Sequence, residues 1–121
     1  MEGVKDVAEQ QLRMTPLIGQ NGLRAAGELD LAVSQELHGA LSVLVEGGGD
    51  VVLDLRDVSF LDSECLAVIV RAAMALGESG TLVLAEPSRA VTRLLTLTGV
   101  VKIVPNLLVH ESAPHRRVTD G

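Results

Sequence analysis

The stretch VVLDLRDVSFLDSECL, residues 51–66, decides the fold of this chain. Its first five residues form a short apolar run of the kind found in buried β-strands. The part from Arg56 to Ser63 is acidic and carries two serine hydroxyls, and an apolar segment of helical length follows it. We therefore predict a strand at residues 51–55, then a loop, then a helix that begins at Ser63.

The pair Asp62-Ser63 stands at the start of this predicted helix. Asp and Ser commonly cap the unpaired backbone N–H groups of a first helical turn. The same position favours added negative charge, because the positive end of the helix dipole lies there. Ser63 is thus suited both to capping and to phosphorylation, and the two residues alone leave both roles open.

Strands and helices alternate on either side of this stretch. Strands are predicted at residues 11–18, 23–27, 51–55, 81–85 and 102–104, and helices at residues 31–46, 63–78 and 88–98. Glycines follow each predicted helix, as expected where a helix ends. The alternation predicts an α/β fold with a mixed, mostly parallel β-sheet of about four to five strands, covered by three to four helices. One domain is expected over residues 10–109, with flexible termini at 1–9 and 110–121.

The composition is that of one globular domain. The chain has 121 residues, of which 47% are hydrophobic and 21% charged. Phe60 is the only aromatic residue, so Val, Leu, Ile and Ala must build the core. The net charge of −6, with ten dispersed Lys and Arg residues, argues against direct nucleic-acid binding. No apolar run approaches the roughly 20 residues of a membrane span, and no signal-peptide pattern begins the chain, so we expect a cytoplasmic protein.

Residues with catalytic potential show little organisation. His38, His110 and His115 have no metal-like spacing, and the glycines at 47–49 lack the lysine of a phosphate-binding loop. Cys65 is the only cysteine, so no intramolecular disulfide can form, which fits a reducing compartment. Because the acidic residues around Cys65 disfavour a thiolate, we expect its side chain to be a small apolar filler and not a reactive group. We expect a binding module without a metal or cofactor, and no enzyme.

The predicted helix at 63–78 has an unusually narrow polar face. Its three charged residues, Glu64, Arg71 and Glu78, are spaced by seven and fall on one stripe. Ala67, Ala75 and Met74 beside this stripe are therefore expected at the surface or at a contact with a partner. The pattern alone fits equally well with a helix that is buried more deeply than usual.

Residues 55–66 resemble the signature of bacterial anti-sigma factor antagonists, which are small cytoplasmic STAS-domain proteins. Residues 27–30 look like the family's turn from its second strand into its first helix, and residues 88–100 look like its third helix and the strand that follows. The resemblance implies a single STAS domain with Ser63 as the phosphorylation site. It also implies partner switching: the unmodified protein binds an anti-sigma factor that is also a serine kinase of the ATP-binding histidine-kinase-like type, and phosphorylation ends the binding.

Partner contacts are expected at the residues that the resemblance and the helix pattern single out. These are Asp30, Asp57, Ser59, Asp62, Glu64, Ala67 and Arg71. We expect a monomer or weak dimer. Glu64 and Cys65 depart from the family, which usually has a small residue and then Gly at these places. The carboxylate of Glu64 would repel a phosphate on Ser63, and a side chain at 65 would add bulk where a kinase approaches.

Two other functions remain as alternatives. One is a STAS scaffold module of a stress-signalling complex that is never phosphorylated. The other is a receiver-like phosphoacceptor that uses Asp54 or Asp57. The receiver-like alternative is disfavoured, because such a site needs a cluster of acidic residues from the ends of two strands. Only Gln20-Asn21-Gly22, with no acidic residue, follows the first predicted strand.

Overall fold

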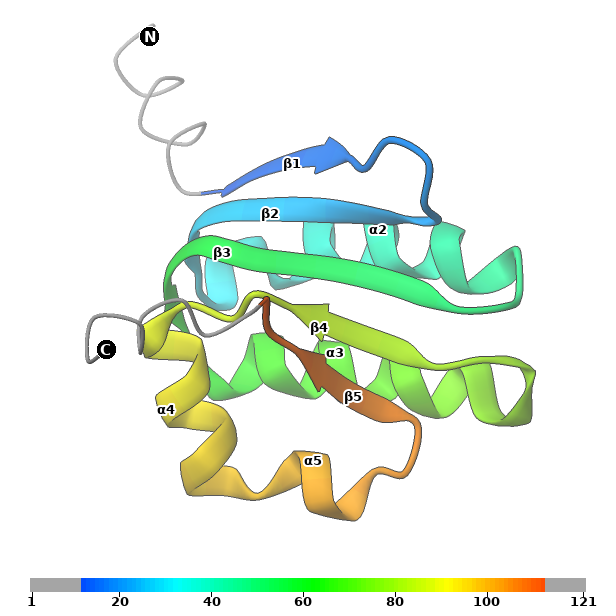
Figure 1. Ribbon diagram of the computed structural model, residues 1–121. Helices are drawn as coiled ribbons and strands as arrows, with labels where there is room; N and C mark the ends of the chain where they lie inside the picture. The colour runs from blue at the N-terminus through cyan, green and yellow to red at the C-terminus, as the bar shows by residue number, and fades with distance from the viewer. Residues whose placement is uncertain (1–11, 113–121) are drawn as a thin grey trace, which may run out of the picture.

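The computed structural model describes residues 12–112, which form one five-stranded sheet and four α-helices (Figure 1). The strands are β1 (Leu12–Pro16), β2 (Gly22–Leu29), β3 (Val51–Leu61), β4 (Leu82–Ala85) and β5 (Leu107–His110). The helices are α2 (Ser34–Glu46), α3 (Ser63–Leu76), α4 (Arg89–Thr98) and α5 (Val100–Ile103), with 3₁₀ turns η1 (Leu31–Val33) and η2 (Gly77–Ser79). The flexible termini that the sequence predicts include residues 1–9 and 113–121, which lie outside the described residues.

The sheet has the order β1-β2-β3-β4-β5. β1 is antiparallel to β2, and the other three pairs are parallel, which confirms the predicted mixed, mostly parallel sheet. In Figure 1, α2 and α3 lie side by side behind the sheet. Because each of these helices connects two parallel strands, both run in the same direction and begin at the carboxyl edge of the sheet.

The core lies between the sheet and its helices. Leu53 and Leu55 of β3 are fully buried, and they meet Leu37 and Leu41 of α2 and Ile69 of α3 in one hydrophobic cluster. Burying each such side chain stabilises the fold by roughly 1.5–3 kcal/mol. The cluster consists of Leu, Val, Ile, Ala and Cys residues, whereas Phe60 is 48% exposed.

β3 is longer than the sequence predicts, because residues 56–61 continue the strand instead of forming a loop. Leu55, Val58 and Leu61 are buried at a spacing of three residues, where a regular strand would bury every second one. The register against β2 shifts twice, between Arg24 and Ala26 and between Gly27 and Glu28. These shifts explain why the alternation that identifies a strand is lost at residue 56.

The prediction of a strand at residues 102–104 is wrong. Gly99 is left-handed (φ 69°) and α5 follows it, with the N–H of Val104 donating to the carbonyl of Val100. β5 begins only at Leu107, after Asn106 donates its side-chain amide to the carbonyls of Ala73, Gly77 and Gly80. Because β5 ends at His110, the boundary predicted at residue 109 falls inside this strand.

The other helix predictions need smaller changes. The helix predicted at 31–46 begins as the 3₁₀ turn η1 and continues as α2. The helix predicted at 63–78 ends at Leu76, because Gly77 has a positive φ of 54° and breaks it. Glu78 therefore lies in η2, and only Glu64 and Arg71 of the predicted stripe are on α3. The helix predicted at 88–98 is confirmed as α4, with Ser88 as its N-cap.

A cluster of three charged groups lies on the sheet face opposite to that of Leu53 and Leu55, with a buried Asp54 between the partly exposed Arg24 and Arg56. The Asp54 carboxylate, only 4% exposed, accepts contacts from Arg24 Nη2 at 3.2 Å and from Arg56 Nη2 at 3.1 Å. It also accepts a hydrogen bond from the backbone N–H of Arg56 at 3.0 Å. Burial raises the pKa of Asp54, but the hydrogen bonds from Arg56 and the charges of both arginines outweigh it, so the pKa is lowered overall.

We predict that Asp54→Asn lowers the free energy of unfolding at pH 7 by about 1.5–3 kcal/mol, since it removes hydrogen bonds to a charged group. The folded-state pKa is depressed, so the carboxylate stabilises the protein above its unfolded pKa of about 3.9 and loses this effect as the pH falls through the folded value. Urea unfolding between pH 2 and 7 measures the free energy of unfolding and its dependence on pH. The free energy of unfolding of the Asp54→Asn variant should change less with pH than that of the native chain. Asp57→Asn, at an exposed position on the same strand, is the control. Equal losses of unfolding free energy in the Asp54→Asn and Asp57→Asn variants would contradict the stabilising role assigned to Asp54.

Candidate partner-binding site

Ser63 is the first residue of α3 and is exposed to solvent. Asp62 precedes it as the N-cap, and its carboxylate accepts a hydrogen bond from the N–H of Cys65 at 2.9 Å. The carbonyl of Asp62 accepts from the N–H of Leu66 at 3.0 Å. Asp62 is therefore the cap, and the Ser63 hydroxyl lies at the positive end of the helix dipole.

Asp30 begins the neighbouring helical segment. Its carboxylate caps η1 by accepting from the N–H of Ala32 at 3.1 Å. Its carbonyl accepts a hydrogen bond from the Cys65 thiol at 3.3 Å, and the N–H of Asp62 donates to the carbonyl of Leu29 at 3.0 Å. These bonds hold the start of η1 beside the start of α3. The structure thus brings Asp30, Asp62, Ser63 and Glu64 to one edge of the sheet.

Cys65 is fully buried beneath this edge. Burial, followed by the negative charges of Asp62, Asp30 and Glu64, raises the pKa of its thiol to about 12. The thiol is therefore neutral and packs as a small side chain, as the sequence predicts, and it also donates a hydrogen bond, which the sequence does not predict. Because the side chain points into the core, the expectation that it adds bulk at the surface is wrong.

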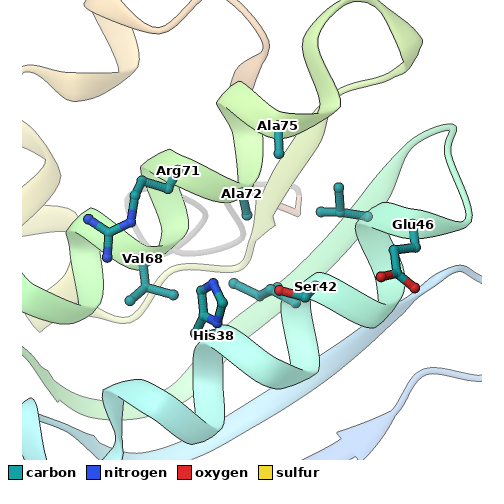
Figure 2. Close-up of a pocket in the computed structure, with 9 residues that line it drawn as sticks. His38, Ser42, Glu46, Val68, Arg71, Ala72 and Ala75 are labelled. Carbon is teal, nitrogen blue, oxygen red and sulfur yellow. The ribbon is translucent and has the colours of Figure 1, made fainter.

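The remaining predicted contact residues lie on β3, before Ser63, and on α3, after it. Ser59 donates its hydroxyl to the carbonyl of Gly27 at 3.4 Å, and Asp57 is exposed opposite Ala26 of β2. Ala67 is half-buried on the second turn of α3. Arg71 is exposed eight residues after Ser63, about 12 Å along the helix, at the groove between α2 and α3 (Figure 2). Arg71 is thus separated from the cluster around Ser63.

Two apolar side chains next to the cluster were not predicted as contact residues. Leu31, directly after Asp30, is 67% exposed, and Phe60, three residues before Ser63, is 48% exposed. Aromatic residues are enriched among the side chains that anchor protein contacts. The signal available in the sequence was that its only aromatic residue stands in the signature stretch instead of in a core pattern.

α4 also begins at this edge of the sheet. The Ser88 hydroxyl donates to the carbonyl of Val58 at 2.6 Å and accepts from the N–H of Val91 at 3.3 Å. This serine is therefore occupied in joining α4 to β3. Among residues 12–112, no group of three or more His, Cys, Asp and Glu side chains is placed to hold a metal ion. The same residues include no helix with the length and apolar character of a membrane span.

Comparison with known proteins identifies the family. Residues 19–109 match the family described as "Mlab, STAS domain". The chain is 36% identical over 80 residues to the anti-sigma-B factor antagonist of Bacillus subtilis (strain 168), a match that covers 65% of this chain and 73% of that protein. The chain therefore belongs to the STAS-domain family of anti-sigma factor antagonists.

Solved structures agree with this fold. An anti-sigma factor antagonist from Mycobacterium paratuberculosis matches with a TM-score of 0.69 and 23% identity, over 90% of this chain and 91% of that one. The anti-sigma factor antagonist SpoIIAA in its unphosphorylated form matches with a TM-score of 0.63 and 16% identity, over 90% and 94%. The phosphorylated form of SpoIIAA, from Bacillus, matches with a TM-score of 0.58 and 14% identity, over 90% of this chain and 97% of that one. At these identities the structures establish the common STAS fold.

We predict that Asp62→Ala lowers the free energy of unfolding by about 1 kcal/mol, because the N–H of Cys65 loses its capping acceptor. Asp62→Asn is the matched control, since Asn keeps a capping oxygen and should cost much less. Urea denaturation of the full chain measures both variants. Equal destabilisation by Ala and Asn would show that the cap does not contribute in the way that the geometry indicates.

Proposed function

We propose that this protein is an anti-sigma factor antagonist that binds an anti-sigma factor with serine-kinase activity and is released when Ser63 is phosphorylated. The observation that carries the proposal is the exposed Ser63 hydroxyl at the start of α3, beside the start of η1. The relationship to the anti-sigma-B factor antagonist supports the class of partner. A partner of this class acts in the cytoplasm, and the protein would act there as a regulator.

The proposed binding surface combines acidic and apolar groups at the carboxyl edge of the sheet. Asp30, Glu64 and the Ser63 hydroxyl provide its polar part, and the exposed side chains of Leu31 and Phe60 provide apolar anchors. An interface with this composition favours a partner with an apolar pocket and basic groups around it. Asp57 and Ser59, which precede this edge on β3, would extend the contact along the strand.

Phosphorylation would change the charge of this surface without changing the fold. Transfer joins the Ser63 oxygen to the γ-phosphorus of ATP and releases ADP, which adds about −1.5 to −2 charges at pH 7. The start of α3 tolerates that charge within the protein. In a desolvated contact the phosphate would meet repulsion unless a partner's Arg or Lys faces it, and neighbouring Asp62 and Glu64 increase the local negative charge.

Glu64 also bears on the alternative of an unphosphorylated scaffold module. Its exposed carboxylate is one residue from the hydroxyl that must approach the γ-phosphate. A like charge at this distance is worth on the order of 1 kcal/mol at the surface, so it would slow the transfer several-fold. A kinase with an Arg facing Glu64 would remove the effect. Cys65 presents no comparable obstacle, because its side chain lies in the core.

The test is phosphorylation by a serine-kinase anti-sigma factor encoded in the same genome, with ATP, followed by intact-mass measurement and peptide mapping. We expect one phosphate, on Ser63, and none on Ser63→Ala. Ser88→Ala is unsuitable as a control because Ser88 caps α4, so Ser112→Ala, at an exposed serine near the end of the described chain, is used instead and should be phosphorylated normally. A phosphate on another residue would overturn the assignment of Ser63, and no phosphate with any such kinase would favour the scaffold alternative.

A further inference from the structure

The outer surface of α2 and α3 contains a groove that the proposed function does not use. Its volume is about 250 Å³, and side chains at helical spacing on both helices form its walls (Figure 2). The residues that line it are His38, Leu41, Ser42, Val45 and Glu46 on α2 and Val68, Arg71, Ala72 and Ala75 on α3. The small side chains of Ala72 and Ala75 leave room for another helix to approach closely.

The groove has opposite charges at its two ends. Arg71 and His38 lie in the half of the groove closer to the helix starts, and Glu46 and Ala75 lie toward the other end (Figure 2). Both helices run in the same direction, so their negative dipole ends lie together beside Glu46. The last turns of α2 and α3 contain no basic residue. The end at Glu46 is therefore negative and lacks a cation from these turns.

Exposed apolar side chains accompany these charges. Val43 of α2 is 69% exposed and Met74 of α3 is 65% exposed. Apart from Glu64 in its first turn and Arg71, α3 carries no charged residue. An exposed helix usually has a wider charged face, and an apolar surface with a few charges indicates a protein contact.

We infer that this groove holds α3 of a second copy of the chain, in an antiparallel two-fold dimer. A two-fold axis perpendicular to the groove places the cationic half of one copy over the anionic half of the other. Arg71 of the second copy then faces Glu46 of the first, and the reverse pair forms by symmetry. The antiparallel arrangement also opposes the dipoles of the two α3 helices. Met74 and Ala75, just beyond Arg71, come near the axis and exclude water there.

The dimer would leave the switch surface free. Ser63 lies about 12 Å along α3 from Arg71, toward the helix start and away from the two-fold axis. Each dimer would thus present two Ser63 surfaces, directed to opposite ends. The inference goes beyond the proposed function and does not depend on phosphorylation or on an anti-sigma factor.

Sedimentation equilibrium of the full chain, from about 1 μM to 1 mM at 0.15 M salt, tests the inference. We expect the weight-average mass to rise toward that of two chains. Arg71→Glu and Glu46→Arg should each weaken self-association at least tenfold, because each places like charges together at both symmetric contacts. Arg93→Glu, with the same charge change at an exposed position on α4, should associate like the native chain.

The decisive measurement mixes the two groove variants. A heterodimer of Arg71→Glu with Glu46→Arg pairs opposite charges at both contacts, so the mixture should associate with an affinity near the native value although neither variant does so alone. Both positions are exposed, and circular dichroism verifies that the variants fold. A native chain that stays monomeric at 1 mM, or a mixture that associates no better than its components, would overturn the inference.

Discussion

The parallel pairing of β2 and β3 continues to the last residue of both strands, and the candidate site depends on it. Leu29 lies opposite Leu61, and the N–H of Asp62 extends the pairing by donating to the carbonyl of Leu29. η1 and α3 therefore begin side by side. The thiol of Cys65 adds a further hydrogen bond to the carbonyl of Asp30. A shift of this register by one residue would turn the buried side chains of β3 to the other face and separate the two helix starts.

The groups at this edge have separate tasks, which supports the proposal that the surface acts as a switch. Asp62 is committed to the cap and Cys65 to the core, whereas the Ser63 hydroxyl is exposed. A phosphate on Ser63 would leave the cap and the core contacts in place, so its effect falls on whatever binds the surface. The buried Asp54 carboxylate, with its partly exposed partners Arg24 and Arg56, lies on the sheet and contributes to stability. Asp54 thus stabilises the sheet, whereas the carboxylates proposed to contact a partner, Asp30 and Glu64, lie at its edge.

Local patterns predicted much of the fold, and long-range contacts explain the misses. The apolar run at 51–55 and the caps Asp62 and Ser88 act within a few residues, so the strand start and two helix starts were predictable. The extension of β3 to Leu61 requires two register shifts against β2, which no local pattern records. The position of β5 depends on Asn106 contacting the carbonyls of Ala73, Gly77 and Gly80, which lie 33, 29 and 26 residues earlier in the chain. At the candidate site, the resemblance singled out Ser63 and Asp30, but the inward direction of Cys65 and the exposure of Leu31 and Phe60 emerge only from the folded chain.

We propose that the charge state of Ser63 controls partner binding, and a comparison of binding affinities tests this proposal most directly. Titration calorimetry would measure the binding of the purified anti-sigma factor to the unmodified full chain and to the chain phosphorylated on Ser63. We expect binding to be at least tenfold weaker for the phosphorylated chain, a difference of about 1.4 kcal/mol or more. Equal affinities for the two forms would contradict it.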